Sequence, residues 1–392
     1  MNRLVLGEYE TLEEAELPLD EAVALAATGA VEVLRTAAPG RWALRAGKHV
    51  GAVRVGETEV QIRPKVPVAR LLYLLGYARD PHGWRDDEVR VAGVDELVPA
   101  MAVSFAALAH RALQQGILQG YEQREESLLL LRGRLCEGEQ VRRRVGLALP
   151  LEVRYDEFTA DIAENRLLLG AARRLLALPG VPAAARGSLV HLTAQLGDVR
   201  VPVAGERLPD VRPTRLNARY RPALRLAELV LRGHSVELLA GGVRASGFLF
   251  DMNRVFEDWL TAALTTALSD HGGVVRPQLR TWLDEASRIP VRPDLTWWRQ
   301  GQCTAVVDAK YKALRLADAP NADLYQMLAY CKVMELPHGH LVYAAGDELP
   351  RTHVIRNSGV EVHVHTIDLA GPVPALQSQV GRLAEQIARR PA

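Results

Sequence analysis

The chain has 392 residues, 48% of them hydrophobic, which exceeds one ordinary domain and predicts two or three domains with real cores. Its 48 basic and 47 acidic side chains nearly cancel, so no overall charge draws it to nucleic acid, and any DNA binding must use a local basic groove or a partner. Three widely spaced cysteines exclude a disulfide framework and a zinc signature, and the absence of an apolar leader or long apolar run predicts a reduced, cytoplasmic protein, neither secreted nor in a membrane.

Residues 1–92 are expected to form a small β-rich domain. Apolar alternation and helical spacing there predict one helix and three strands, at Asp20–Thr28, Trp42–Arg45, Val50–Val55 and Glu59–Arg63. The turn Ile62–Lys65 then leads into an apolar helix around Leu71–Leu75. Gly40–Lys48 only superficially resembles a phosphate-binding loop, because six residues separate its glycines and His49 stands where Ser or Thr should hold Mg²⁺. We therefore expect no nucleotide-binding loop in this chain.

Residues 93–245 are expected to be mainly helical. The predicted helices are Pro99–Gln119, Gln123–Arg134, Val153–Leu169 and Ala223–Leu231. The third is rich in acids near its start, as a well-capped helix is. Prolines from Pro179 onward interrupt the chain, so we expect an ordered loop region after Leu178.

Residues 246–392 combine helix and strand patterns. Apolar residues at helical spacing over Asn253–Ser269 stop at Gly272 and Gly273. The elements expected after them are a strand, a hairpin around a polar loop, a helix and a strand, at Val274–Leu283, around Arg299–Gln302, at Asp323–Glu335 and at His340–Ala345. This order is αβββαβ, so the whole chain is predicted to be a multidomain α+β protein.

Two acids and a lysine are expected to meet on the predicted hairpin. If the hairpin turns about Gly301, Asp294 lies opposite Asp308 with the side chains about 5 Å apart at Cβ. Lys310 projects from the same face as Asp308, because strand side chains alternate. Two close, partly buried carboxylates repel each other unless a proton or a cation lies between them, and Mg²⁺, or Mn²⁺ in its place, meets that need. The cluster suits phosphodiester hydrolysis, although the same residue types also occur at ordinary solvated strand ends.

The sequence PD at residues 293–294 followed by DAK at residues 308–310 resembles the PD-(D/E)xK nuclease motif, and αβββαβ is similar to the core of those restriction-endonuclease-like enzymes. The resemblance implies that Asp294 and Asp308 are metal ligands and that Lys310 is the catalytic lysine. It also implies that Glu257 is an accessory carboxylate at the metal. From the residues alone, Glu257 is equally well a surface acid of its helix.

Gln326 and Tyr330 are four residues apart in the predicted helix and therefore share a face. The sequence DLYQMLAY resembles the Gln-x-x-x-Tyr motif of the RecB-like branch of these nucleases. The resemblance implies that the pair lies near the active site and helps to hold DNA. An ordinary amphipathic helix with Tyr330 packed inward explains the pattern equally well.

Several longer segments resemble the McrC family, the nuclease subunit of methylation-dependent restriction systems, and the resemblance spans nearly the whole chain. They are IRPK at Ile62–Lys65, RGRL at Arg132–Leu135, VRYDEFTADIAENRLLL at Val153–Leu169 and GFLFDMNRVFE at Gly247–Glu257. The resemblance implies a Mg²⁺-dependent endonuclease that cuts double-stranded DNA together with an McrB-like AAA+ GTPase ring. It further implies that residues 1–92 dock on that ring and that the chain stimulates its hydrolysis. The missing phosphate loop agrees with this division of labour.

Two other functions stay open. A stand-alone DNA repair or recombination nuclease of the RecB-like branch would need its own DNA groove. A non-catalytic adaptor docked on a ring ATPase would keep only the fold, and the intact Asp-Asp-Lys set argues against it. A neighbouring gene for an AAA+ protein would favour restriction over repair.

Near the end of the chain, Val360–Ile367 alternates as expected of an edge strand, with Glu361, His363 and His365 on one face. Two histidines two residues apart can bind a metal, but no third ligand beyond that acid is near in sequence, so we expect a structural role. His338 and His340 are interpreted in the same way. A terminal amphipathic helix is predicted over Pro374–Arg390.

Overall fold

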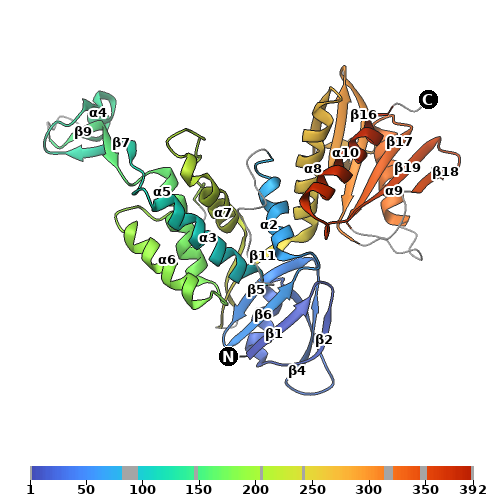
Figure 1. The fold of residues 1–392 in the computed structure, drawn as a ribbon, viewed down its shortest axis with the longest axis horizontal. Coiled ribbons are helices and arrows are strands. Elements are labelled where there is room, and N and C mark those ends of the chain that lie inside the picture. Colours follow the sequence, from blue (N-terminus) through green and yellow to red (C-terminus); the bar gives the residue numbers. More distant parts are fainter. Residues whose placement is uncertain are drawn as a thin grey trace. The chain divides into compact units, whose positions relative to one another are not determined.

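The computed structural model describes residues 2–81, 96–144, 149–203, 206–240, 243–312, 321–344 and 351–389. The chain forms two compact units, Met1–Leu97 with His234–Ala392, and Val98–Gly233 (Figure 1). Its helices and sheets confirm a multidomain protein that mixes α and β structure. The division into three domains at residues 92 and 245 stays a prediction. Within the described ranges, no helix has the length and apolar character needed to cross a membrane.

The first unit contains a five-stranded sheet built from two distant parts of the sequence. Its strand order is β1-β6-β5-β11-β10, with bounds Asn2–Gly7, Thr58–Arg63, His49–Val55, Val243–Asp251 and His234–Ala240. A second sheet and helix α1 pack with it, at Thr11–Glu16 (β2), Arg41–Ala46 (β4), Val31–Arg35 (β3) and Leu19–Ala27. Leu25, Leu44 and Ile62 belong to the shared core. The strands predicted within residues 1–92 are confirmed, as is the apolar helix, α2 (Val68–Tyr77), whereas β10 and β11 were not predicted.

Gly51 allows β5 to pair with β11. Its φ is 137°, and a Cβ at this position would lie 2.0 Å from the carbonyl oxygen of Phe248. No other residue type fits that approach without moving the backbone. Because β11 leads directly into helix α8 (Met252–Ser269), the N-terminal strands hold the start of that helix.

The last part of the chain forms a six-stranded sheet with helices on both faces (Figure 1). The strand order is β12-β15-β16-β17-β19-β18, at Val274–Pro277, Leu295–Arg299, Gln302–Lys310, His338–Ala344, Val360–Ile367 and Arg351–Ile355. Helix α9 (Asn321–Val333) covers one face, where Met327 and Tyr330 share a core with Leu341. Helices α8 and α10 (Val373–Ala388) contact each other and the sheet. Apart from two two-residue strands between β12 and β15, the order α8, β12, β15, β16, α9, β17 matches the predicted αβββαβ.

The predicted strand Val274–Leu283 is wrong in its extent. It ends at Pro277, and Gln278 turns the chain with a φ of 48°. The residues beyond form β13 (Thr281–Trp282), which pairs with β14 (Pro290–Val291) as a separate two-stranded sheet. A proline has no N–H to donate to a ladder, which explains why the regular strand stops there.

The prediction that Val360–Ile367 is an edge strand is also wrong, because β19 lies between β17 and the outer strand β18. Parallel pairing of β17 with β19 brings four histidines together, and the ring of His340 lies 5.2 to 5.5 Å from the rings of His338, His363 and His365. The Nδ1 of His340 is 3.0 Å from the Nε2 of His365. These rings line a cavity of about 480 Å³ that includes none of the predicted site residues.

Because these histidines are buried, we expect the free energy of unfolding to fall in mild acid. Burial lowers the pKa of His340, and burial together with the charge of His363 lowers the pKa of His365 to about 4. An unfolded histidine titrates near 6.5, so this stability is fully present above that pH and is lost as the pH falls toward the folded value. For His365 alone, the free energy of unfolding should fall by about 2 kcal/mol between pH 7 and pH 5.

Chemical denaturation at the two pH values tests this expectation. A His365→Gln variant should lose this part of the pH dependence, because glutamine does not titrate. His353→Gln, on the outer strand β18, should keep it. An unchanged pH dependence in His365→Gln would contradict the assignment.

The second unit is less helical than predicted. Its helices are α3 (Leu97–Leu113), α4 (Glu137–Arg144), α5 (Ala163–Ala177), α6 (Ala183–Gln195), α7 (Arg221–Arg232) and a 3₁₀ turn at Ala218–Tyr220, and its sheet is β7-β9-β8 at Gly120–Leu128, Leu151–Thr159 and Arg134–Leu135. The predicted helix Gln123–Arg134 is wrong, because its first half lies in β7. The predicted helix Val153–Leu169 starts as β9 and becomes helical only at Ala163. The expected loop region after Leu178 contains α6, whose N-cap is Pro182.

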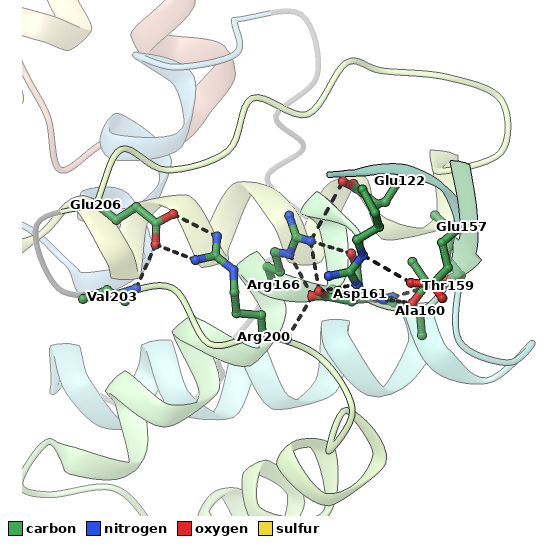
Figure 2. Close-up of polar contacts among 12 residues, drawn as sticks. Glu122, Glu157, Thr159, Ala160, Asp161, Arg166, Arg200, Val203 and Glu206 are labelled. Carbon is green, nitrogen blue, oxygen red and sulfur yellow. Dashed lines mark hydrogen bonds and ion pairs between the residues drawn. The ribbon is translucent and has the colours of Figure 1, made fainter. Parts of the chain in front are cut away.

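The charged segment before α5 forms an ion-pair network, and no side chain caps the helix (Figure 2). Asp161 accepts hydrogen bonds from Arg166 Nε at 2.8 Å and from the backbone N of Arg200 at 2.9 Å. Arg200 in turn pairs with Glu206 at 2.8 Å. The Arg166 guanidinium holds the pKa of Asp161 below its usual value. These acids therefore tie a strand end, a helix start and a loop together.

Candidate active site

The predicted hairpin is present. Strands β15 and β16 are antiparallel and turn at Gln300 and Gly301, whose φ angles are 49° and 82°. Leu295 pairs with Val307, so Asp294, the residue before β15, faces the next residue of β16, Asp308. Asp294 Oδ2 accepts a hydrogen bond from the backbone N of Ala309 at 2.8 Å. The predicted meeting of the two aspartates is thus confirmed as geometry.

A β-bulge alters the register only toward the loop. Trp297 pairs with Ala305, but Trp298 pairs with Cys303, so Thr304 is an extra residue on β16. Its Oγ1 donates to the carbonyl oxygen of Trp297 at 3.1 Å. The bulge was not predicted, and it leaves the pairing beside the aspartates unchanged.

Burial and like charge raise the pKa of both aspartates. Burial, followed by the charge of Asp308, raises the pKa of Asp294 to about 8. Asp308 is only 2% exposed, and burial raises its pKa against the opposing effect of the Lys310 ammonium. At neutral pH such a pair shares a proton unless a cation replaces it. A divalent cation between the two carboxylates would take the place of that proton.

Lys310 contacts one of the two acids directly. Its Nζ lies 2.5 Å from Asp308 Oδ2 and donates to Gln326 Oε1 at 2.8 Å. Burial lowers the pKa of Lys310, but the charge and hydrogen bond of Asp308 outweigh burial and leave the pKa raised. The side chain is thus an ammonium at neutral pH, suited to stabilising negative charge.

Helix α9 supports this lysine through Gln326 and Tyr330. Gln326 Nε2 donates to the hydroxyl of Tyr330 at 2.8 Å, and that hydroxyl donates to the carbonyl oxygen of Arg292 at 3.2 Å. Tyr330 is buried in the sheet core, as the interpretation as an ordinary amphipathic helix requires, yet its hydroxyl reaches the site. The structure therefore joins Gln326 and Tyr330 to Lys310, and their role with DNA stays a prediction.

Glu257 lies near the aspartates without touching them. Its Oε1 accepts a hydrogen bond from Gln278 Nε2 at 2.5 Å. Its charge contributes to the raised pKa of Asp294. In the described part of the chain, no three His, Cys, Asp or Glu side chains are arranged to hold a metal ion. The accessory role of Glu257 stays a prediction.

Asp323 is a further acid near the site that was not singled out from the sequence. It is buried in the first turn of α9, where its Oδ2 accepts the hydroxyl of Tyr343 at 2.5 Å and pairs with Lys312 Nζ at 2.7 Å. Its charge raises the pKa of both Asp308 and Lys310. Its spacing of three residues from Gln326 on one helix face was the signal in the sequence.

The donor set fits a hard divalent cation. Asp294 and Asp308 supply carboxylate oxygens, and Mg²⁺ needs only one or two protein carboxylates because water and phosphate oxygens complete its shell. A cation between the aspartates would also offset the charge of Asp308, which, after burial, raises the pKa of Asp294.

Comparisons with known proteins find one matching family model and similar solved structures. The family model described as McrBC 5-methylcytosine restriction system component matches residues 44–344. A solved structure described as a half-complex from a tetradecameric assembly of Thermococcus gammatolerans McrB AAA+ hexamers with bound McrC is similar over 98% of this chain and 100% of that chain, at 19% identity and a TM-score of 0.65. The T. gammatolerans McrBC complex matches over 68% and 88% of the two chains, at 20% identity and a TM-score of 0.42. No curated protein matches. The likeness to the half-complex shows a shared fold.

Proposed function

Because this chain belongs to the family of McrBC 5-methylcytosine restriction system components, we propose that it is the nuclease subunit of such a system, a Mg²⁺-dependent endonuclease that cuts double-stranded DNA with an AAA+ GTPase ring. The observation that carries the proposal is the meeting of Asp294, Asp308 and Lys310 at one end of the hairpin. Together with the αβββαβ order, it supports a PD-(D/E)xK core.

Each residue has a distinct task in the proposed reaction. Asp294 and Asp308 would hold Mg²⁺, which would supply positive charge to the phosphate and make water more acidic. The Lys310 ammonium stabilises the negative charge that grows on the phosphate oxygens. The side-chain oxygen of Gln326 accepts a hydrogen bond of 2.8 Å from that ammonium and so holds it in place. The amide of Gln326 in turn donates to the Tyr330 hydroxyl at 2.8 Å.

Family membership favours this function over a stand-alone RecB-like nuclease. The structure also offers a reason to prefer an enzyme over a ring-docking adaptor. Two neighbouring acids whose pKa values are raised by burial cost stability, and such pairs cluster at functional sites. An adaptor would gain nothing from keeping them.

Reconstitution tests the proposal. The chain alone should hydrolyse neither GTP nor ATP, and it should not cut DNA specifically. With its AAA+ partner, nucleotide and Mg²⁺, it should cut methylated DNA, and EDTA should stop cleavage. Equal cleavage without the partner would instead favour the stand-alone nuclease.

The docking surface is tested by surface substitutions, because a deletion of residues 1–92 would strip β5 from β11. Leu19 and Val23 are exposed and four residues apart on α1, so changing both to glutamate should abolish stimulation of the partner's hydrolysis and leave metal binding intact. The matched control changes Leu129 and Leu130 to glutamate. These two residues lie in the second unit and are 72% and 80% exposed. Loss of stimulation in the control alone would move the docking surface to that unit.

A further inference from the structure

A buried contact joins the N-terminal sheet to the residue that follows Lys310. The hydroxyl of Tyr311 donates to Glu8 Oε2 at 3.1 Å, and the two residues are 8% and 4% exposed. Glu8 follows β1 directly, and Tyr311 follows β16 directly. The contact therefore connects the start of the chain to the end of the catalytic strand, within the first compact unit.

Glu8 is fixed by the turn Ile62–Lys65, which the sequence marked and the proposed chemistry did not use. Its Oε2 also accepts the backbone N of Lys65 at 2.7 Å, and its own backbone N donates to the carbonyl oxygen of Arg63 at 3.1 Å. Burial raises the pKa of Glu8, although both of its donors oppose that shift. Both donors bind the same carboxylate oxygen, Oε2, so Lys65 and Tyr311 together determine where Glu8 lies.

Tyr311 is anchored where the sheet no longer holds the chain. The pairing of β16 with β17 ends at Lys310, opposite Tyr343. The ring of Tyr311 lies 6.1 Å from the ring of Phe256 on α8, the neighbour of Glu257. The backbone at Lys310 is thus held by the sheet on one side and by Tyr311 on the other.

We propose that Glu8 and Tyr311 are positioning residues that hold the end of β16, and with it the Lys310 ammonium, in the geometry that cleavage requires. Without the hydroxyl contact, Tyr311 keeps only its ring packing, and the ammonium shifts relative to the phosphate. A displacement of 1 Å lowers a rate by up to about a hundredfold. The inference rests on the proposed nuclease function and extends it to two residues outside the metal site.

The test is a set of substitutions in the complete chain, assayed with the AAA+ partner. Tyr311→Phe should lower kcat of cleavage by roughly tenfold, with KM for DNA, metal affinity by calorimetry and partner stimulation unchanged. Glu8→Ala should lower kcat at least as much, because it removes the acceptor of the Lys65 backbone N as well as that of Tyr311. Glu8→Gln, which keeps an acceptor oxygen, should restore most of the rate. The double variant Glu8→Ala/Tyr311→Phe should be no slower than Glu8→Ala, because that single variant already removes the contact with Tyr311.

Tyr220→Phe is the matched control. Tyr220 is buried in the second unit and accepts the backbone N of Leu118 at 2.8 Å, so its loss should lower stability without lowering kcat. Cleavage by Tyr311→Phe at the native rate would overturn the inference, as would additive losses in the double variant. An equal fall of cleavage and partner stimulation would show a folding or docking defect and also overturn it. If the native chain itself does not cut with its partner, the proposed function fails, which separates that failure from the others.

Discussion

Replacing Lys310 with alanine is expected to abolish metal-dependent DNA cleavage while metal binding stays at least as tight as in the native chain. The lysine ammonium lies 2.5 Å from Asp308 and competes with a bound cation for that carboxylate, so its removal cannot weaken metal binding through charge. In the proposed reaction it is also the cation that stabilises the growing charge on the phosphate. Loss of one such group costs at least about a hundredfold in rate.

Asp308→Ala and Lys310→Ala should differ in metal affinity. Asp308→Ala should lose both cleavage and metal binding, because one of two carboxylate ligands is gone. The protein should stay folded, since removing one of two close buried acids relieves their repulsion. Lys332→Ala is the control, because this exposed lysine on α9 donates to the carbonyl oxygen of Ser358 away from the aspartates.

Calorimetric titration with Mg²⁺ or Mn²⁺ and a cleavage assay with the partner measure the two properties separately. Full cleavage by a folded Asp308→Ala or Lys310→Ala protein would contradict the proposed catalytic role of the substituted residue. Cleavage lost together with metal binding in Lys310→Ala would place the lysine among groups that build the metal site.

The hairpin was predictable because its information is local. Side chains alternate along each strand, and Gly301 sits at the turn with a φ of 82°, so the register near Asp294 followed from spacing. Helices α8 and α9 were predictable for a similar reason, because each has apolar residues at helical spacing. The bulge at Thr304 was not, since nothing in the local pattern requires an extra residue there.

The second unit shows where local patterns fail. Gln123–Arg134 is polar and leucine-rich, which favours a helix, but Gly120–Leu128 pairs along its whole length with β9, more than twenty residues later. That distant partner decides the structure. The prolines after Leu178 wrongly predicted a loop where the chain forms a helix. Pro182 precedes the first turn of α6, where a missing N–H costs nothing.

The unpredicted parts of the site are contacts between distant residues. Glu8 and Tyr311 are brought together by pairing of β1 with β6 and of β5 with β11, which no spacing rule reveals. The histidines of β17 and β19 appeared as two separate pairs in the sequence, and parallel pairing placed them on one face. Local patterns predicted the candidate reacting groups, and only the fold showed the contacts that hold them.

A single residue inserted between Leu295 and Thr296 is expected to lower metal affinity by at least about tenfold and to abolish cleavage, because metal sites are sensitive to the placement of each ligand. A slip of one residue turns every side chain before the insertion to the opposite face of the strand. Asp294 then points away from Asp308 and loses its hydrogen bond from the backbone N of Ala309. Calorimetric titration with Mn²⁺, with circular dichroism to show folding, measures the effect.

The bulge supplies a matched control for this insertion. An alanine inserted between Trp297 and Trp298 lies opposite the extra residue Thr304, so it completes the ladder and leaves the pairing of Leu295 with Val307 unchanged. A glycine added after Gly301 lengthens only the loop. Both controls should bind metal and cut DNA far better than the first insertion, although all three lengthen the same hairpin by one residue. Equal metal binding by all three folded proteins would show that the facing of Asp294 and Asp308 does not build the metal site.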